Sequence, residues 1–171
     1  MREIDKRPAR AGEVSVPTFG ELDPLLRELA AAREAAAVAQ SPTPELLVML
    51  DAAIAISAQH ADRLAEATRA IPRAGVVAYL GLLLKAYPNP GSQDAAIFGG
   101  FMRDDVMSLE PSFGAVEMAC RRWRRKSKFL PAIAEMMLEV KVANDELNGA
   151  ADFVRRLPRL RAACAATLSS S

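Results

Sequence analysis

Hydrophobic residues recur along most of this chain at spacings of three, four and seven residues, and short segments with proline or glycine separate these stretches. Such a periodicity indicates amphipathic helices, and β-branched residues nowhere gather into the runs that strands require. Alanine is abundant and aromatic residues make up only 5% of the chain, which favours closely packed helices. We therefore expect an all-α fold, a multi-helix bundle of about six or seven helices.

Two alanine-rich helices are predicted in the first half of the chain. Asp23 is expected to cap the first helix, which runs to about Gln40. Thr43 is expected to cap a long second helix, which ends before Pro72. The narrow apolar stripe of the second helix consists of Leu46, Leu50, Ala53, Ser57, Ala61 and Leu64. The two helices would pack as an antiparallel hairpin, which is either scaffold or a surface for dimerisation or partner binding.

The middle of the chain predicts two further helices. Val76 to Tyr87 is the most apolar run and is interpreted as the central buried helix, which Pro88 to Gly91 ends. Ser92 can cap the next helix, from Gln93 to about Leu109.

The stretch from Phe113 to Val140 is the part around which the other helices are expected to be arranged. Ser112 can cap its first helix, whose buried face is predicted to be Val116, Ala119, Cys120 and Trp123, with the basic residues pointing largely outward. The next helix begins near Pro131 and should stop at Asn148-Gly149. A last basic helix, from Ala150 to about Ala166, is expected to be shortened or kinked by Pro158.

These elements divide the chain into four predicted regions. Residues 1–18 mix charges with proline and glycine and should form a flexible arm. Residues 19–72 form the helical hairpin, residues 73–166 a helical core domain, and residues 167–171 a frayed tail.

Charge is distributed unevenly along the chain. Residues 111–171 carry 11 Lys and Arg against 6 Asp and Glu, whereas residues 1–70 carry 8 against 11. This polarity suggests an acidic partner, either nucleic acid or an acidic protein, although a solvated helix face explains it equally well. The candidate nucleic-acid-binding residues are Arg121, Arg122, Arg124, Arg125, Lys126 and Lys128, with Trp123 available to stack on a base.

Residues for catalysis, metal binding or cofactor binding are not grouped in any recognisable motif. His60 is the single histidine, Cys120 and Cys164 lack metal-ligand spacing, and there is no phosphate-binding glycine loop. Asp104 and Asp105 are adjacent, so on a helix they point about 100° apart. We therefore expect no enzyme activity, no metal and no cofactor.

Because no signal peptide or membrane-spanning run is evident, we expect a cytoplasmic protein without a membrane partner.

Four segments of the chain resemble, in order, the motifs of one protein family. They are LLLKAYPNP (Leu82 to Pro90), a helix with an aromatic anchor at Phe98 or Phe101, the helix Val116 to Cys120, and SKFLPAIAE (Ser127 to Glu135). Over about residues 79–139 they are similar to the phage replicative-helicase loader/inhibitor family, and the last segment is the most distinctive. The structural-motif residues that the resemblance selects are Tyr87, Pro88, Phe129, Pro131 and Glu135.

The resemblance implies a helical domain that binds a hexameric replicative helicase, helps to deliver it to an origin-bound initiator and has no ATPase of its own. It also implies a bacterial cytoplasm or a phage-infected cell as the location. Ala132 stands where the family pattern has a capping threonine. From the residues themselves, Phe129 and Leu130 are expected to pack on the first turn of the following helix, and Glu135 to lie near the positive end of its dipole.

Three functional hypotheses follow from the sequence. The first is a non-enzymatic protein-interaction module of a phage or prophage replication system that binds a replicative helicase for loading or inhibition. The second is a nucleic-acid-binding helical protein that uses the basic stretch 121–128. The third is a structural or regulatory protein that forms a homo-oligomer through the alanine-rich hairpin.

Overall fold

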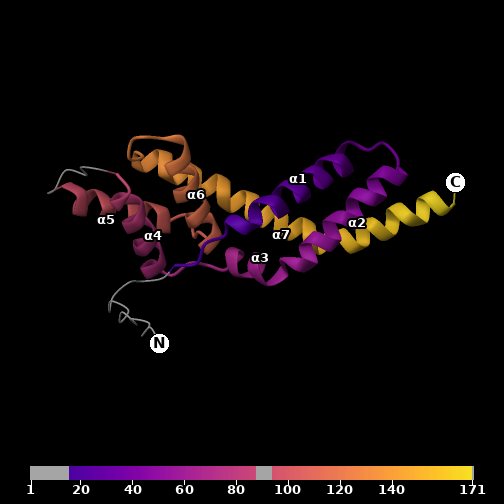
Figure 1. Ribbon diagram of the computed structural model, residues 1–171, viewed down its shortest axis with the longest axis horizontal. Coiled ribbons are helices and arrows are strands. Elements are labelled where there is room, and N and C mark those ends of the chain that lie inside the picture. Colours follow the sequence, from indigo (N-terminus) through magenta and orange to yellow (C-terminus); the bar gives the residue numbers. More distant parts are fainter. Residues whose placement is uncertain (1–15, 88–93, 171) are drawn as a thin grey trace, which may run out of the picture.

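The computed structural model describes residues 16–87 and 94–170, and within these ranges the chain forms seven α-helices in an elongated bundle (Figure 1). The predicted all-α class is confirmed. The elements are the 3-10 helix η1 (Gly20–Leu22) and the helices α1 (Asp23–Val38), α2 (Pro44–Gln59), α3 (Ala61–Thr68), α4 (Arg73–Lys85), α5 (Asp94–Met107), α6 (Phe113–Lys126) and α7 (Ile133–Ser169).

Two of the predicted helix caps are confirmed. Thr43 Oγ1 accepts a hydrogen bond from the backbone N–H of Leu46 at 3.1 Å, and Ser112 Oγ accepts one from Ala115 at 3.3 Å. The predicted cap at Asp23 is wrong, because Leu22 occupies the N-cap position of α1 and Asp23 stands in its first turn. The Asp23 carboxylate instead accepts charge-assisted hydrogen bonds from a guanidinium on α6, which are stronger than a bond from a neutral N–H. The predicted cap Ser92 lies outside the described residues.

The predicted long second helix is interrupted at His60, which ends α2 and precedes the first residue of α3. Before the interruption the predicted stripe is correct, since Leu46, Leu50, Ala53 and Ser57 are all buried. Beyond it Leu64 is buried but Ala61 is exposed, because the break changes which face of the chain meets the core.

The predicted stop at Asn148-Gly149 is also wrong, and α7 runs without a break through Gly149 and Pro158 to Ser169. Buried residues recur at helical spacing on both sides of the expected stop and hold this long helix in place. They are Leu147, Ala150, Phe153, Leu157 and Cys164. Their burial outweighs the helix penalties of a glycine, about 1 kcal/mol, and of an interior proline, about 3 kcal/mol, so Pro158 does not shorten the helix as predicted. Residues 167–169, predicted to be frayed, are therefore helical.

The last residues of the predicted flexible arm are anchored, which corrects that prediction for residues 16–18. Tyr79 donates its hydroxyl hydrogen to the Pro17 carbonyl, and Arg63 donates to the Thr18 carbonyl. Phe19 follows directly and is completely buried. Residues 1–15 lie outside the described part of the chain.

Helix α6, rather than α4, is the central buried helix. Every residue from Gly114 to Arg121 is buried, whereas Val77 and Leu82 of α4 are half exposed. Two clusters of hydrophobic side chains meet at α6 and α7: one includes α1, α2 and α3, and the other includes α4 and α5. The hairpin of α1 and α2 lies beside the C-terminal part of α7, and α4 and α5 lie at the opposite end of the molecule (Figure 1).

Gly114 marks the closest approach between α6 and its neighbours. A Cβ atom at this position would lie 2.8 Å from both Ala67 Cβ and Leu147 Cδ1, and 3.0 Å from the Ala67 carbonyl oxygen. Because that backbone can move only with α3, we expect Gly114→Ala to lower the free energy of unfolding by about 1–3 kcal/mol. Urea denaturation followed by circular dichroism measures this change.

The control is Gly81→Ala in α4, where no atom lies within 4 Å of the added Cβ. There the alanine should raise the free energy of unfolding by about 0.5–1 kcal/mol, since it only removes the conformational freedom of glycine from the unfolded chain. Equal stabilisation by both substitutions would contradict the tight packing at Gly114.

Candidate functional site

The basic segment 121–128 occupies the C-terminal turns of α6 and the start of the following loop. The six predicted nucleic-acid-binding residues fall into three environments. Arg121 is buried, Arg122 and Lys126 are held by carboxylates, and Arg124, Arg125 and Lys128 are exposed.

Arg121 is enclosed by two carboxylates. Its Nη1 and Nη2 atoms lie 2.6 and 2.9 Å from the two carboxylate oxygens of Asp23, and its Nε lies 3.0 Å from Glu117 Oε1. Only 10% of the Arg121 side chain and 6% of the Glu117 side chain are exposed. The prediction that Arg121 points outward is therefore wrong, because its charge is satisfied inside the protein.

The two carboxyl groups respond to this environment in opposite directions. Hydrogen bonds from Arg121 hold the pKa of Asp23 below its ordinary value. Burial raises the pKa of Glu117, although Arg121 opposes this effect. Nearby in α6, burial raises the pKa of the Cys120 thiol to about 12, so this cysteine stays protonated at neutral pH.

Trp123 is not available to stack on a base, in contrast to the prediction. The indole is 7% exposed, and its Nε1–H donates to the Phe129 carbonyl at 2.8 Å. Lys126 lies 4.6 Å from the centre of its ring and also pairs with Glu139. The aromatic ring and this cation therefore hold the loop after α6 in place.

The structural-motif residues also lie around this loop. The Tyr87 hydroxyl donates to the Ser127 carbonyl at 3.3 Å, Pro131 is buried, and Glu135 Oε2 accepts from the Ala132 N–H at 2.7 Å. The last contact is half of a capping box, since Ala132 has no side-chain acceptor to complete it. The role of Glu135 at the start of α7 agrees with the sequence analysis.

Phe129 does not pack on the first turn of α7 as predicted, and 79% of its surface is exposed. Its backbone takes the structural role instead, because the carbonyl accepts from Trp123 and from the hydroxyl of Ser127. Pro88 lies outside the described residues.

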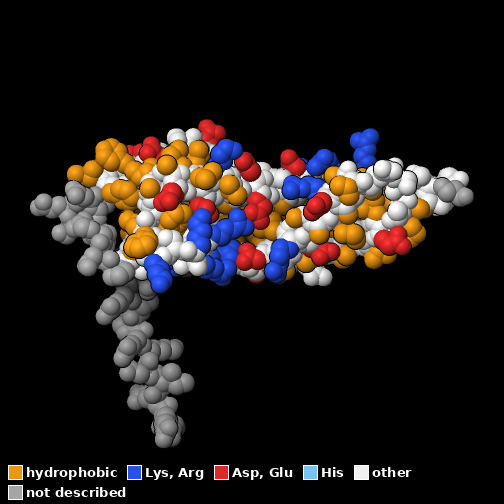
Figure 2. All heavy atoms as spheres, turned by 90° about the horizontal axis from the view of Figure 1, so that it is seen from above, with side chains coloured by type: hydrophobic (Ala, Val, Ile, Leu, Met, Phe, Trp, Pro, Cys, Tyr) orange, Lys and Arg blue, Asp and Glu red, His pale blue; other side chains and the backbone are white. Residues whose placement is uncertain are grey.

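Many hydrophobic side chains lie on the surface at the end of the molecule that contains α4 and α5, and others lie toward the opposite end (Figure 2). Nine large hydrophobic side chains are exposed among the described residues, and seven of them belong to α4, α5, the α6–α7 loop or the N-terminal turns of α7. We call these seven residues the apolar end, and they are Val77, Leu82, Ile97, Phe101, Phe129, Leu138 and Val142. The other two, Val38 and Val48, lie in the hairpin.

Sequence reasoning missed two carboxylates and one arginine that shape the basic region. Glu117 stands four residues before Arg121 on the same helix. Because this spacing favours an ion pair, the contact could have been predicted from the sequence. Asp23 and Arg27 belong to α1, and nothing local in the sequence brings that helix to α6.

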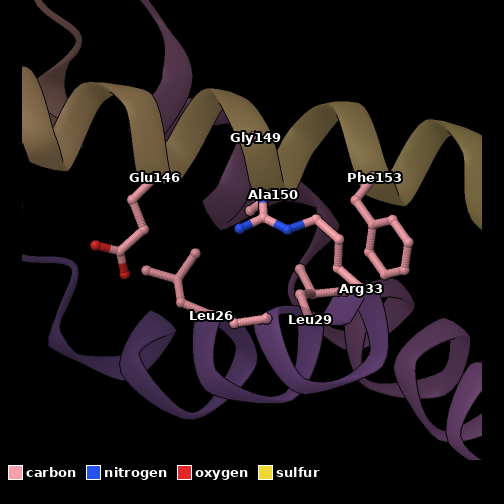
Figure 3. Close-up of a pocket in the computed structure, with 8 residues that line it drawn as sticks. Leu26, Leu29, Arg33, Glu146, Gly149, Ala150 and Phe153 are labelled. Carbon is pink, nitrogen blue, oxygen red and sulfur yellow. The ribbon is translucent and has the colours of Figure 1, made fainter. Parts of the chain in front are cut away.

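A small cavity lies between α1 and α7, and Arg33 of α1 extends across it toward Gly149 and Ala150 of α7 (Figure 3). The side chains of Leu26, Leu29 and Phe153 line its sides. Its volume of about 20 Å³ holds about one water molecule.

In residues 16–87 and 94–170 no three His, Cys, Asp or Glu side chains are grouped to hold a metal ion. None of the helices described is both long and apolar enough to span a bilayer.

Comparison of the chain with protein-family models, with curated proteins and with solved structures finds no match.

The first prediction for this region concerns stability. Arg121→Met leaves Glu117 buried without its cation, and we expect the free energy of unfolding to fall by about 3–5 kcal/mol. Arg124→Met is the control, because Arg124 is exposed on the same helix and its loss should change the free energy by no more than about 0.5 kcal/mol. Adding Glu117→Met to Arg121→Met should recover much of the loss in denaturant unfolding. If both single variants are equally stable, the buried ion pair does not hold α6.

A second prediction concerns pH. Because the folded protein lowers the pKa of Asp23, this carboxylate stabilises the fold above about pH 4, and the stabilisation is lost as pH falls through the folded-state pKa. Asp23→Asn should therefore lower the unfolding temperature at pH 7, and its difference from the wild type should shrink on acidification. A difference that stayed constant between pH 7 and pH 3 would contradict this assignment.

Proposed function

We propose that this chain is a non-enzymatic protein-interaction module of a phage or prophage DNA replication system, and that it binds a hexameric replicative helicase through the apolar end for loading or inhibition. One observation supports this proposal above the others: most of the exposed large hydrophobic side chains gather at one end of the molecule. Apolar patches that are kept in contact with water usually mark a surface for a protein partner.

Pairs of side chains within this surface have the spacing of helix-borne anchors. Ile97 and Phe101 lie one turn apart on α5, and Leu138 and Val142 lie one turn apart on α7. Helices α5 and α7 are in contact with each other. Two short apolar strips on neighbouring helices suit the insertion of hydrophobic side chains from a partner.

The helicase as partner rests on the resemblance. Residues 79–139, which resemble the loader/inhibitor family, comprise α4 from Tyr79 onward, α5, α6 and the first turns of α7. This segment carries five of the seven residues of the apolar end, and the other two, Val77 and Val142, lie just outside it. An interaction through apolar contacts also agrees with the internal pairing of Arg121, Arg122 and Lys126.

Two alternative functions, nucleic-acid binding and self-association, are tested in the same experiment as helicase binding. Nucleic-acid binding would use the exposed basic residues Arg124, Arg125 and Lys128, and self-association would use the hairpin. The apolar stripe of α2 packs against α7 and α1, which leaves Val38 and Val48 as the exposed large hydrophobic residues of the hairpin.

We expect a salt-tolerant complex when the purified protein is mixed with a hexameric replicative helicase and examined by size-exclusion light scattering at two salt concentrations, because apolar contacts are little screened. The double variant Ile97→Glu with Phe101→Glu should abolish the complex, since it places two charges in the apolar surface. Val38→Glu with Val48→Glu is the matched control and should bind as the wild type does.

The absence of a complex at micromolar protein would overturn the helicase as partner. Equal binding by both double variants would overturn the apolar end as the surface. The same run with the protein alone and with DNA separates the alternatives: a dimer that the Val38/Val48 variant loses supports the hairpin, and a salt-sensitive complex with DNA alone supports nucleic-acid binding.

A further inference from the structure

A polar cleft of about 210 Å³ opens between α1, α6 and α7, and none of its lining residues belongs to the apolar end. Its charged lining side chains are Asp23 and Arg27 from α1, Arg121, Arg122 and Arg125 from α6, and Glu146 from α7. Four guanidinium groups therefore face two carboxylates in a cleft that three helices form. Counting Glu117, which lies behind Arg121, the local charge is still positive.

The two arginines of the cleft that have no close carboxylate partner lie on different helices. Arg27 has no hydrogen bond or ion pair with any residue that the structure describes. Arg125 is 3.9 Å from Asp23 through its Nη1, and 69% of its side chain is exposed. The other two arginines are each paired, since Arg121 pairs with Asp23 and Glu117, and Arg122 pairs with Glu146 at 2.8 Å.

The two carboxylates at the cleft are already engaged by arginines, which reduces their repulsion of an incoming anion. Both oxygens of Asp23 accept from Arg121, and Glu146 accepts from Arg122 through Nη2. Other N–H groups of Arg122 have no acceptor among the described residues, so this side chain can donate to a ligand while it keeps its partner. Arg121 acts as a positioning residue, because its Nε donates to Glu117 while its Nη1 and Nη2 donate to the two oxygens of Asp23 and hold that carboxylate in place.

We propose that this cleft binds a phosphate group, either free or as an ester, with Arg27 and Arg125 as its main donors and Arg122 as a third. The planar fork of each guanidinium matches the spacing of two phosphate oxygens, and a phosphate offers enough oxygens to accept from arginines that approach from different helices. The bound group would bridge α1 and α6 and neutralise the surplus charge. This inference does not rest on the binding of a helicase.

The test uses the full chain and two probes of the same chemistry. Inorganic pyrophosphate is titrated by isothermal calorimetry at low salt, and an oligothymidylate is titrated under the same conditions. The variant Arg27→Gln with Arg125→Gln removes both main donors, and Arg156→Gln with Arg159→Gln removes the same charge from exposed positions in the C-terminal part of α7. Thermal unfolding without ligand shows that each variant is folded.

We expect saturable pyrophosphate binding by the wild type and by the Arg156/Arg159 variant, and a dissociation constant at least about tenfold higher for the Arg27/Arg125 variant. A parallel loss of oligothymidylate binding would support the cleft with a phosphate ester as its source, whereas binding of pyrophosphate alone would support it with a free phosphate. If the wild type saturates with neither probe, or if both variants weaken binding equally, the proposal is overturned.

Discussion

The charge of Arg121 is the constraint on which the arrangement around α6 depends. A guanidinium is costly to bury unless carboxylates pair with it, and the chain supplies Glu117 from the same helix and Asp23 from α1. The pair with Asp23 fixes the first turn of α1 against α6, while the glycine at position 114 brings α6 against α3 and α7. As a result α6 lies between the two hydrophobic clusters and cannot present its basic residues as one surface.

Features that depend on neighbouring residues could be predicted from the sequence. The caps at Thr43 and Ser112 and the buried face with Val116 and Trp123 follow from local hydrogen bonding and helical spacing, and they agree with the structure. The all-α class follows for the same reason, because helical periodicity is itself a local property.

Features that depend on distant partners could not be predicted. Asp23 has the chemistry of a cap, but an arginine 98 residues further along the chain provides a stronger interaction. Gly149 has the chemistry of a helix stop, but the apolar residues that follow it pack on α1 and α2, so the helix continues. The candidate surfaces could not be predicted from the sequence for the same reason. The periodicity at Ile97 and Phe101 indicates a helix, but whether these two side chains are exposed depends on which face of that helix α4 and α7 cover.

The two candidate surfaces differ in the physics of binding, and this difference keeps them experimentally separable. The apolar end would gain free energy from the removal of hydrophobic surface from water, which salt hardly weakens, whereas the arginine cleft would act through charges that salt screens. Helix α7 passes unbroken beside both hydrophobic clusters, with Met136 and Val140 in one and Leu147 in the other. Because no helix end or loop within α7 separates the clusters, a ligand in the cleft has no hinge there through which to move the apolar end, and the two surfaces are expected to bind independently.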